Sequence, residues 1–181
     1  MTDRRSPHIS PIALFIDLIQ ANQDAFRLSG TDGELGEAIT NAYTSMSFAV
    51  QVLLVEDFEP YRNFIARSLR EKEGFQVASQ ATDGLEAVAR ALELKPDLIL
   101  LDIGLPKLSG IEAARKIREV APDSKIIFLT QETSPEVVSE AFNVGACGYV
   151  IKSQAASDLM PAMQAALEGK RFVSAGLDQY S

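Results

Sequence analysis

Five polar side chains follow short apolar segments in this chain of 181 residues. Glu56 and Asp57 come after QVLLV, Asp102 after LILL, Thr130 after KIIFL and Lys152 after YVI. If these segments are neighbouring parallel strands, their carboxyl ends meet at one edge of the sheet, where open α/β sheets bind ligands. Taken singly, each residue is more often a helix cap, a turn residue or a solvated surface residue. Their occurrence together at four segment ends favours a shared chemical site.

That site would suit Mg2+ and a phosphoryl group. Mg2+ prefers hard oxygen ligands and keeps several waters, so Glu56, Asp57 and Asp102 could bind it. Without a cation, clustered carboxylates raise one another's pKa, and the metal would relieve that repulsion. One carboxylate could then attack phosphorus and form an acyl phosphate, and we predict Asp102, because it follows the segment expected to be central. Lys152 would be the counter-charge of the phosphoryl oxygens, and Thr130 would donate a hydrogen bond to them.

The segments that carry these residues alternate with stretches of helical periodicity from Gln51 onward. This alternation is typical of βα units that build a parallel sheet with helices on both faces. The third segment is apolar at successive positions, which predicts burial on both of its faces and a central place in the sheet. The predicted strands are 51–55, 75–81, 98–102, 125–130 and 147–151.

Capping signals support the helices between these strands. Asp83 with Glu86, and Ser109 with Glu112, have the spacing of a capping box, in which each residue's side chain bonds the backbone of the other. The helix that starts at Asp83 is expected to bury an apolar stripe at positions i, i+3, i+4 and i+7. That stripe is Leu85, Val88, Ala89 and Leu92.

Composition narrows the function classes. The formal net charge of -8 argues against direct binding to nucleic acid. The single Cys147 cannot form an internal disulfide, and no segment approaches the roughly 20 apolar residues that span a bilayer. We therefore expect a cytoplasmic protein without a membrane contact.

Residues 1–46 lie outside the βα pattern. They are expected to be a docking or dimerisation hairpin or else a loosely ordered extension, and Met46 is an alternative natural start. Two short helices are predicted there, one over about 34–43 and one from the spacing of Ile12, Phe15, Ile16 and Ile19.

The stretch from about Gln51 to Gly169 resembles the receiver domain of two-component response regulators. The segments VLLVED, DLILLDIGLPKLSGIEAARKIRE, IIFLT and GACGYVIKS carry this resemblance. It implies a doubly wound, flavodoxin-like α/β fold with five parallel strands in the order 2-1-3-4-5. The chain would then consist of an N-terminal extension (1–46), a receiver domain (47–170) and a short C-terminal tail (171–181).

The resemblance also implies roles for individual residues. Glu56 and Asp57 match the metal-binding acidic pair, and Asp102 matches the phosphoacceptor. Thr130 matches the switch hydroxyl. Lys152 matches the lysine that pairs with the phosphoryl group.

Further positions match or depart from the family pattern. Tyr149 matches the aromatic switch residue, and the main-chain carbonyl of Gly104 matches a metal ligand. Ser153 stands where many receivers have proline. The segments GYVIKS and EGKRFVS together look most like the subgroup that is often joined to a helix-turn-helix domain. Gln131 replaces a small residue after Thr130 and is expected to narrow access to Asp102.

The implied function is a Mg2+-dependent switch. A histidine kinase or phosphotransfer protein would phosphorylate Asp102, Thr130 would move toward the phosphoryl group, and Tyr149 would rotate inward. The protein-binding surface for a downstream target would change as a result. The chain would not be an enzyme, although it would assist its own phosphoryl transfer and hydrolysis, and a homodimer stays open.

Three alternatives remain. The chain could be the receiver part of a truncated DNA-binding transcriptional regulator, or a degenerate receiver that binds its target constitutively. An aspartate-nucleophile phosphatase is disfavoured, because such enzymes have a second acid where this chain has Gly104.

Overall fold

Six parallel strands form the centre of residues 49–177, the part of the chain that the computed structural model describes. Their order is β2-β1-β3-β4-β5-β6, and every neighbouring pair is parallel. The predicted order of the first five strands is confirmed. The predictions for residues 1–46 lie outside the described residues. The strands are β1 (Val50–Val55), β2 (Phe75–Ala81), β3 (Leu98–Leu101), β4 (Lys125–Thr130), β5 (Gly148–Ile151) and β6 (Phe172–Val173).

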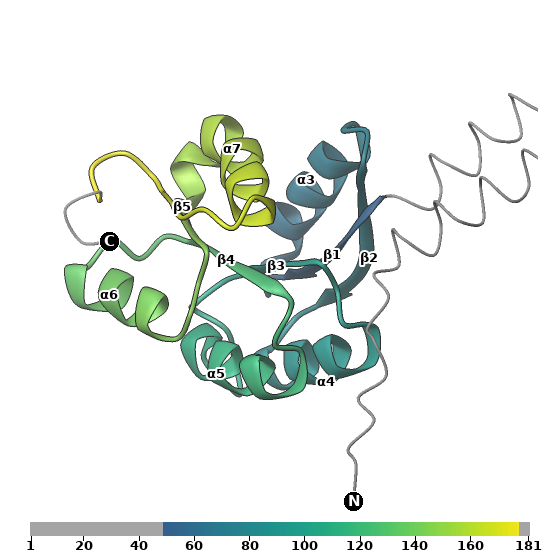
Figure 1. Ribbon diagram of the computed structural model, residues 1–181, viewed down its shortest axis with the longest axis horizontal. Helices are drawn as coiled ribbons and strands as arrows, with labels where there is room; N and C mark the ends of the chain where they lie inside the picture. Colours follow the sequence, from purple (N-terminus) through teal and green to yellow (C-terminus); the bar gives the residue numbers. More distant parts are fainter. Residues whose placement is uncertain (1–48, 178–181) are drawn as a thin grey trace, which may run out of the picture. The chain divides into compact units, whose positions relative to one another are not determined.

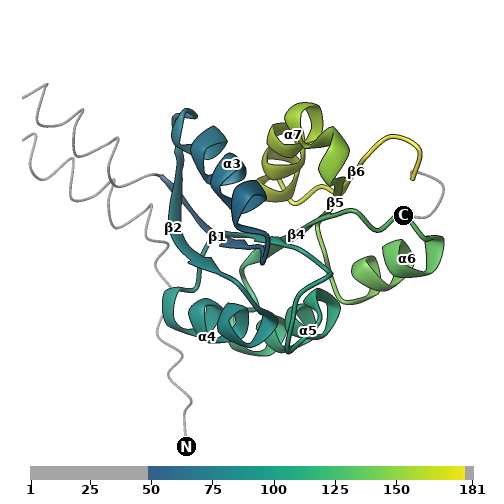
Figure 2. The same cartoon turned by 180° about the vertical axis from the view of Figure 1, so that it is seen from behind.

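Helices cover both faces of the sheet (Figures 1 and 2). On one face, α3 (Glu59–Arg70) and α7 (Ala155–Leu167) share a core with alternate residues of the strands, such as Val52 and Leu54 of β1. On the other face, α4 (Gly84–Leu94), α5 (Gly110–Val120) and α6 (Pro135–Asn143) share a core with the alternate strand residues that point that way, such as Leu53 and Val55 of β1. Strands buried on both faces read as continuous apolar runs, which explains the sequences of β1, β3 and β4. Among these helices, none is long and apolar enough to cross a membrane.

The buried face of α4 differs from the prediction. Leu85 and Leu92 are 52% and 55% exposed, and Ala89 is exposed as well, whereas Gly84, Ala87 and Ala91 are buried. Val88 alone of the predicted stripe packs, partly buried, against the core. Small residues let α4 lie close to its neighbours: a Cβ on Gly84 would fall 2.0 Å from the carbonyl oxygen of Leu108. The close approach of α4 to the Leu108 backbone therefore requires small residues on the buried face, and the larger leucines point outward.

The two predicted capping boxes have different outcomes. At α5 the box is complete, with the Ser109 side chain accepting from the Glu112 N–H and the Glu112 carboxylate accepting from the Ser109 N–H. At α4, Asp83 accepts from the Glu86 N–H, but the Glu86 carboxylate bonds the N–H of Thr82 instead. The prediction of a reciprocal box at α4 was therefore wrong. Thr82 provides a competing backbone donor one residue earlier.

The segment expected as a C-terminal tail extends the sheet. Phe172 and Val173 form β6, which pairs with Gly148 and Tyr149 of β5. The hydroxyl of the buried Ser174 lies 2.6 Å from Asp158 Oδ2, to which it donates, and 3.1 Å from the Ile151 N–H, from which it accepts. These hydrogen bonds attach the segment to β5 and α7. With β6 the sheet has six strands, where five were predicted.

Candidate functional site

The carboxyl ends of four strands bring the predicted polar residues to one edge of the sheet. Glu56 and Asp57 follow β1, and Asp102 follows the central β3. Thr130 is the last residue of β4, and Lys152 follows β5. Parallel pairing places these ends side by side, so the gathering expected from the sequence is observed.

Three carboxylates form a cluster at this edge. One oxygen from each of Glu56, Asp57 and Asp102 lies within 4.8 Å of the others. Glu56 and Asp102 are buried, at 2% and 6% exposure, whereas Asp57 is exposed. The donor set fits a hard cation such as Mg2+, because all three ligands are oxygens and the exposed side leaves room for waters.

The Lys152 ammonium lies between the two buried carboxylates. Its Nζ is 2.6 Å from Glu56 Oε2 and 3.0 Å from Asp102 Oδ2, and the side chain is 10% exposed. Burial raises the pKa of Glu56 above its usual value, while its hydrogen bond and charge interaction with Lys152 lower that pKa and the charge of Asp102 raises it. Lys152 therefore offsets part of the electrostatic cost of burying two acids together.

Backbone donors orient both buried acids. The Ile103 N–H donates to Asp102 Oδ1 at 2.8 Å, which leaves Oδ2 beside the lysine. The Phe58 N–H donates to Glu56 Oε1 at 3.2 Å. A Cβ on Gly104 would be 3.6 Å from Asp102 Oδ2, so the backbone that carries the predicted carbonyl ligand runs next to the phosphoacceptor candidate.

The two predicted switch residues do not hydrogen-bond to the carboxylates within the described part of the chain. Thr130 is buried, and its Oγ1 accepts from the Glu132 N–H at 3.3 Å. The Tyr149 ring is fully buried, and its hydroxyl donates to the Glu132 carbonyl at 3.0 Å. Burial raises the pKa of Tyr149, so the phenol stays neutral. The Tyr149 ring thus lies inward in this structure, and its rotation on phosphorylation stays a prediction. Gln131, directly after Thr130, is exposed.

Two residues of α3 belong to the site and were missed from the sequence. Arg62 Nη1 donates to the carbonyls of Glu56 at 2.7 Å and Asp57 at 3.2 Å. The Tyr61 ring centroid lies 5.1 Å from Lys152 Nζ. Side chains in the first turn of a helix tilt back toward its N-terminus. The positions of Tyr61 and Arg62, four and five residues after Asp57, could therefore have indicated that both lie near the site.

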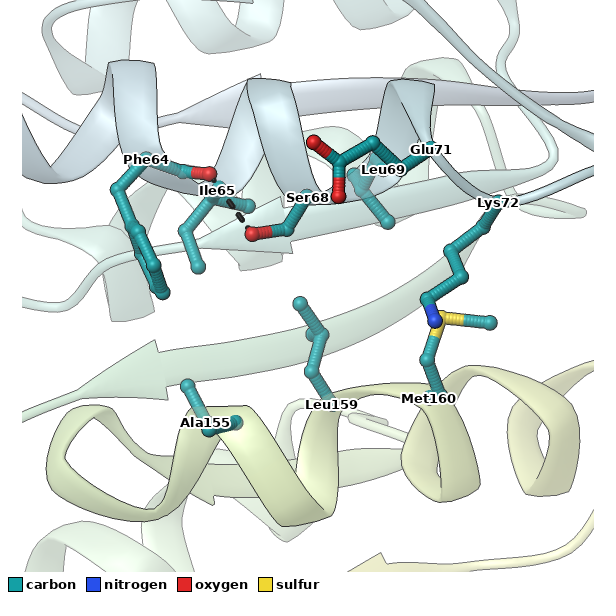
Figure 3. A pocket seen from close by; sticks show the side chains of 10 residues that line it. Phe64, Ile65, Ser68, Leu69, Glu71, Lys72, Ala155, Leu159 and Met160 are labelled. Atoms are coloured by element: carbon teal, nitrogen blue, oxygen red, sulfur yellow. Dashed lines mark hydrogen bonds between the residues drawn. The ribbon is translucent and has the colours of Figure 1, made fainter.

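A separate groove lies between α3 and α7 (Figure 3). Figure 3 shows Leu159 of α7 facing Ile65 and Leu69 of α3, with Phe64 at one end and Met160 and Lys72 at the other. The groove has a volume of about 240 Å³. None of the five predicted site residues lines it, so it is not part of the carboxylate cluster.

Comparison with known proteins identifies the family. Residues 52–164 match the family model of the response regulator receiver domain. The chain belongs to this family. The response regulator GacA of Pseudomonas viridiflava is 33% identical over 130 residues, which are 72% of this chain and 61% of that protein. The response regulator UvrY of Escherichia coli (strain K12) is 33% identical over 130 residues, covering 72% of this chain and 60% of that protein.

Solved structures agree with the assignment. A LuxR-family two-component response regulator from Aurantimonas sp. SI85-9A1 has a TM-score of 0.70 and 32% identity, covering 73% of this chain and 94% of that one. The response regulator domain of CheB from Thermotoga maritima has a TM-score of 0.63 and 30% identity, covering 66% and 97%. The receiver spans about 61% of the length of the curated relatives it matches. Its matched region contains all the candidate site residues, whereas β6 lies beyond it.

Proposed function

We propose that this receiver accepts a phosphoryl group on Asp102 in a Mg2+-dependent reaction. The observation that carries the proposal is the position of Asp102 Oδ2, which lies 3.0 Å from the Lys152 ammonium within a cluster of three carboxylates. Glu56, Asp57, Asp102 and the Gly104 carbonyl would hold the cation. When bound, Mg2+ would neutralise phosphoryl oxygens and lower their repulsion of the attacking carboxylate.

The chain's own residues supply the orientation. The Ile103 N–H binds one oxygen of Asp102 and so directs the other toward the lysine. In the transfer, an Asp102 oxygen would form a bond to phosphorus as the bond from phosphorus to the donor's nitrogen breaks. Lys152 and Thr130 would then bind the phosphoryl oxygens, through an ammonium and a hydroxyl hydrogen bond. The chain assists this transfer and the later hydrolysis, and it turns over no separate substrate.

The proposed output is a changed binding surface around α6, β5 and α7. Thr130 would move toward the phosphoryl group, and the buried position of Tyr149 would be stabilised. A phosphorylated state can shift this equilibrium only if it interacts more favourably with one position than with the other. The partners would be a histidine kinase or phosphotransfer protein upstream and a protein target downstream.

The deciding experiment uses a small-molecule phosphodonor with and without Mg2+. We expect intact-mass and phosphate-affinity gel analysis to show one acid-stable, base-labile phosphate on the native chain when Mg2+ is present. Asp102→Asn should gain none. Equal labelling of both chains would refute Asp102 as the acceptor. No labelling of a native chain with a normal circular dichroism spectrum would favour a degenerate receiver that binds its target constitutively.

A second arm tests the proposed upstream partner. Autophosphorylated histidine kinases from the source organism are mixed with the native chain and with Asp102→Asn. Transfer of label to the native chain alone would support a kinase as the donor. Labelling by the small donor but by no kinase would argue for a different source of phosphate.

A second candidate function is the receiver part of a DNA-binding regulator. One relative, 34% identical over 119 residues, is named a putative transcriptional regulator of Pseudomonas aeruginosa. A coding sequence that continues past Ser181 into a DNA-binding unit would support this candidate. A stop codon directly after Ser181 would argue against it.

A further inference from the structure

The Lys152 ammonium has an aromatic neighbour in addition to its two carboxylates. Tyr61, in the first turn of α3, places its ring centroid 5.1 Å from Nζ. This distance is within the range in which the negative face of an aromatic ring attracts a cation. The ring is therefore a third group that holds the ammonium, after Glu56 and Asp102.

Tyr61 also contacts the backbone of the same lysine. Its hydroxyl donates to the Lys152 carbonyl at 3.4 Å, so one side chain touches both the head group and the main chain of Lys152. Lys152 begins a short 3-10 turn (Lys152–Gln154) between β5 and α7, away from the regular hydrogen bonds of the strand. A second contact at this point restricts both the turn and the long side chain that leaves it.

We propose that Tyr61 is a positioning residue that holds the Lys152 ammonium over Asp102 during phosphoryl transfer. The inference rests on the proposed function of Asp102. Asp102 is poorly suited to this task, because it changes its charge and shape when it becomes phosphorylated, which leaves Glu56 and Tyr61 as the lasting partners of the ammonium. The ring of Tyr61 is unchanged by that reaction. Because the ring is neutral, it does not compete with the phosphoryl oxygens for the Lys152 ammonium. Lysine benefits from such a guide because its four-carbon stem has many rotamers.

The surroundings keep the phenol neutral. Burial, followed by the charges of Glu56 and Asp102, raises the pKa of Tyr61. The hydroxyl thus remains a donor to the Lys152 carbonyl at all pH values at which the domain would work. The ring also lies 6.1 Å from the ring of Phe64, a half-exposed residue on the same helix. Among the described residues the cation–π contact of Lys152 is with Tyr61 and not with Phe64. Phe64 therefore provides a matched control.

The test compares Tyr61→Phe, Tyr61→Leu and Phe64→Leu in the Mg2+-dependent labelling reaction with a small phosphodonor. We expect Tyr61→Phe to stay within about twofold of the native rate, because the ring is retained. Tyr61→Leu should be slower by about three- to tenfold, as the loss of a partly buried cation–π contact predicts. Phe64→Leu should match the native rate. Urea unfolding of each variant shows whether the fold is retained.

A second readout does not depend on the transfer rate. The NMR chemical shifts of the Lys152 side-chain CH2 groups should show the ring-current effect of Tyr61 in the native chain and in Tyr61→Phe, and lose it in Tyr61→Leu. A native transfer rate in Tyr61→Leu, or equal losses in all three variants, would overturn the positioning role while Asp102 still takes up phosphate. A native chain that takes up no phosphate would instead reject the proposed function, and with it the role of Tyr61.

Discussion

Glu56 is ionisable and almost fully buried, and this position makes part of the protein's stability depend on pH. Burial raises the pKa of its carboxyl in the folded chain above the ordinary value of 4.5. An acid whose pKa is raised by folding favours the folded state below the unfolded pKa, and this contribution is lost as the pH rises through the folded pKa. Glu56 therefore lowers the stability of the metal-free chain at neutral pH. A buried acid of this kind belongs to the residue pattern that a cation site requires.

We predict that, without Mg2+, the free energy of unfolding of the native chain, relative to Glu56→Gln, falls as the pH rises from below the ordinary pKa of 4.5 to neutrality. The fall should be about 1.4 kcal/mol for each pKa unit by which folding raises this carboxyl. Urea unfolding at several pH values measures the difference, and the exposed Glu119→Gln is the control, for which no such slope is expected. A pH-independent difference for Glu56→Gln would show that burial does not perturb this acid.

At the scale of elements, the loop between β3 and α5 is held by close backbone packing. The Gly110 N–H donates to the Ile103 carbonyl at 2.9 Å, and a Cβ on Gly110 would lie 1.9 Å from the Asp102 carbonyl oxygen. Lys107, in the same loop, has a positive φ of 65° and pairs with the buried Asp83 at the start of α4. The start of α5 and the start of α4 thus both fix the loop that carries Gly104.

We predict that Gly110→Ala lowers the free energy of unfolding by about 1–3 kcal/mol, because the new methyl group overlaps backbone atoms and must push the loop away. The displaced loop should also slow Mg2+-dependent labelling of Asp102. Gly104→Ala is the matched control for stability: its Cβ would make an ordinary 3.6 Å contact, and a change within about 0.5 kcal/mol is expected. Urea unfolding of both variants decides between them, and equal destabilisation would contradict the argument.

Local signals and tertiary contacts explain which elements were predictable. The strand of residues 75–81 and the Ser109–Glu112 capping box were correct because they depend on neighbouring residues in the chain. The buried face of α4 was wrong because two overlapping stripes satisfy the helical spacing, and the choice depends on how closely the helix approaches Leu108. The contact of Tyr61 with Lys152 joins residues 91 positions apart, and a two-residue strand such as β6 has no periodicity to detect.

At the scale of the whole domain, the segment after α7 covers an edge of the sheet that would otherwise be open. Unpaired strand edges can pair with other chains, so covering them limits association. Here Ser174 accepts the Ile151 N–H and donates to Asp158, while Leu177 is 5% exposed within the core. The domain as folded is therefore larger than the region that matches the family model, residues 52–164.

We predict that Ser174→Ala lowers the free energy of unfolding by about 1–3 kcal/mol, because it leaves a buried N–H and a carboxylate oxygen without this partner. Hydrogen exchange of the Ile151 amide should become faster at the same time. The neighbouring exposed Ala175→Ser should change neither quantity. An unchanged exchange rate in Ser174→Ala would mean that β6 is held to the sheet by other contacts.

The composition around the carboxylates also has an optical consequence. The chain contains no tryptophan and four tyrosines, and two of these, Tyr61 and Tyr149, lie at the site. Tyrosine emission is therefore not masked by a stronger indole signal. The Tyr61 ring lies near the Lys152 ammonium, and the buried Tyr149 bonds the Glu132 carbonyl. Ultraviolet absorption and fluorescence of the unlabelled protein would therefore report cation binding and acylphosphate formation directly.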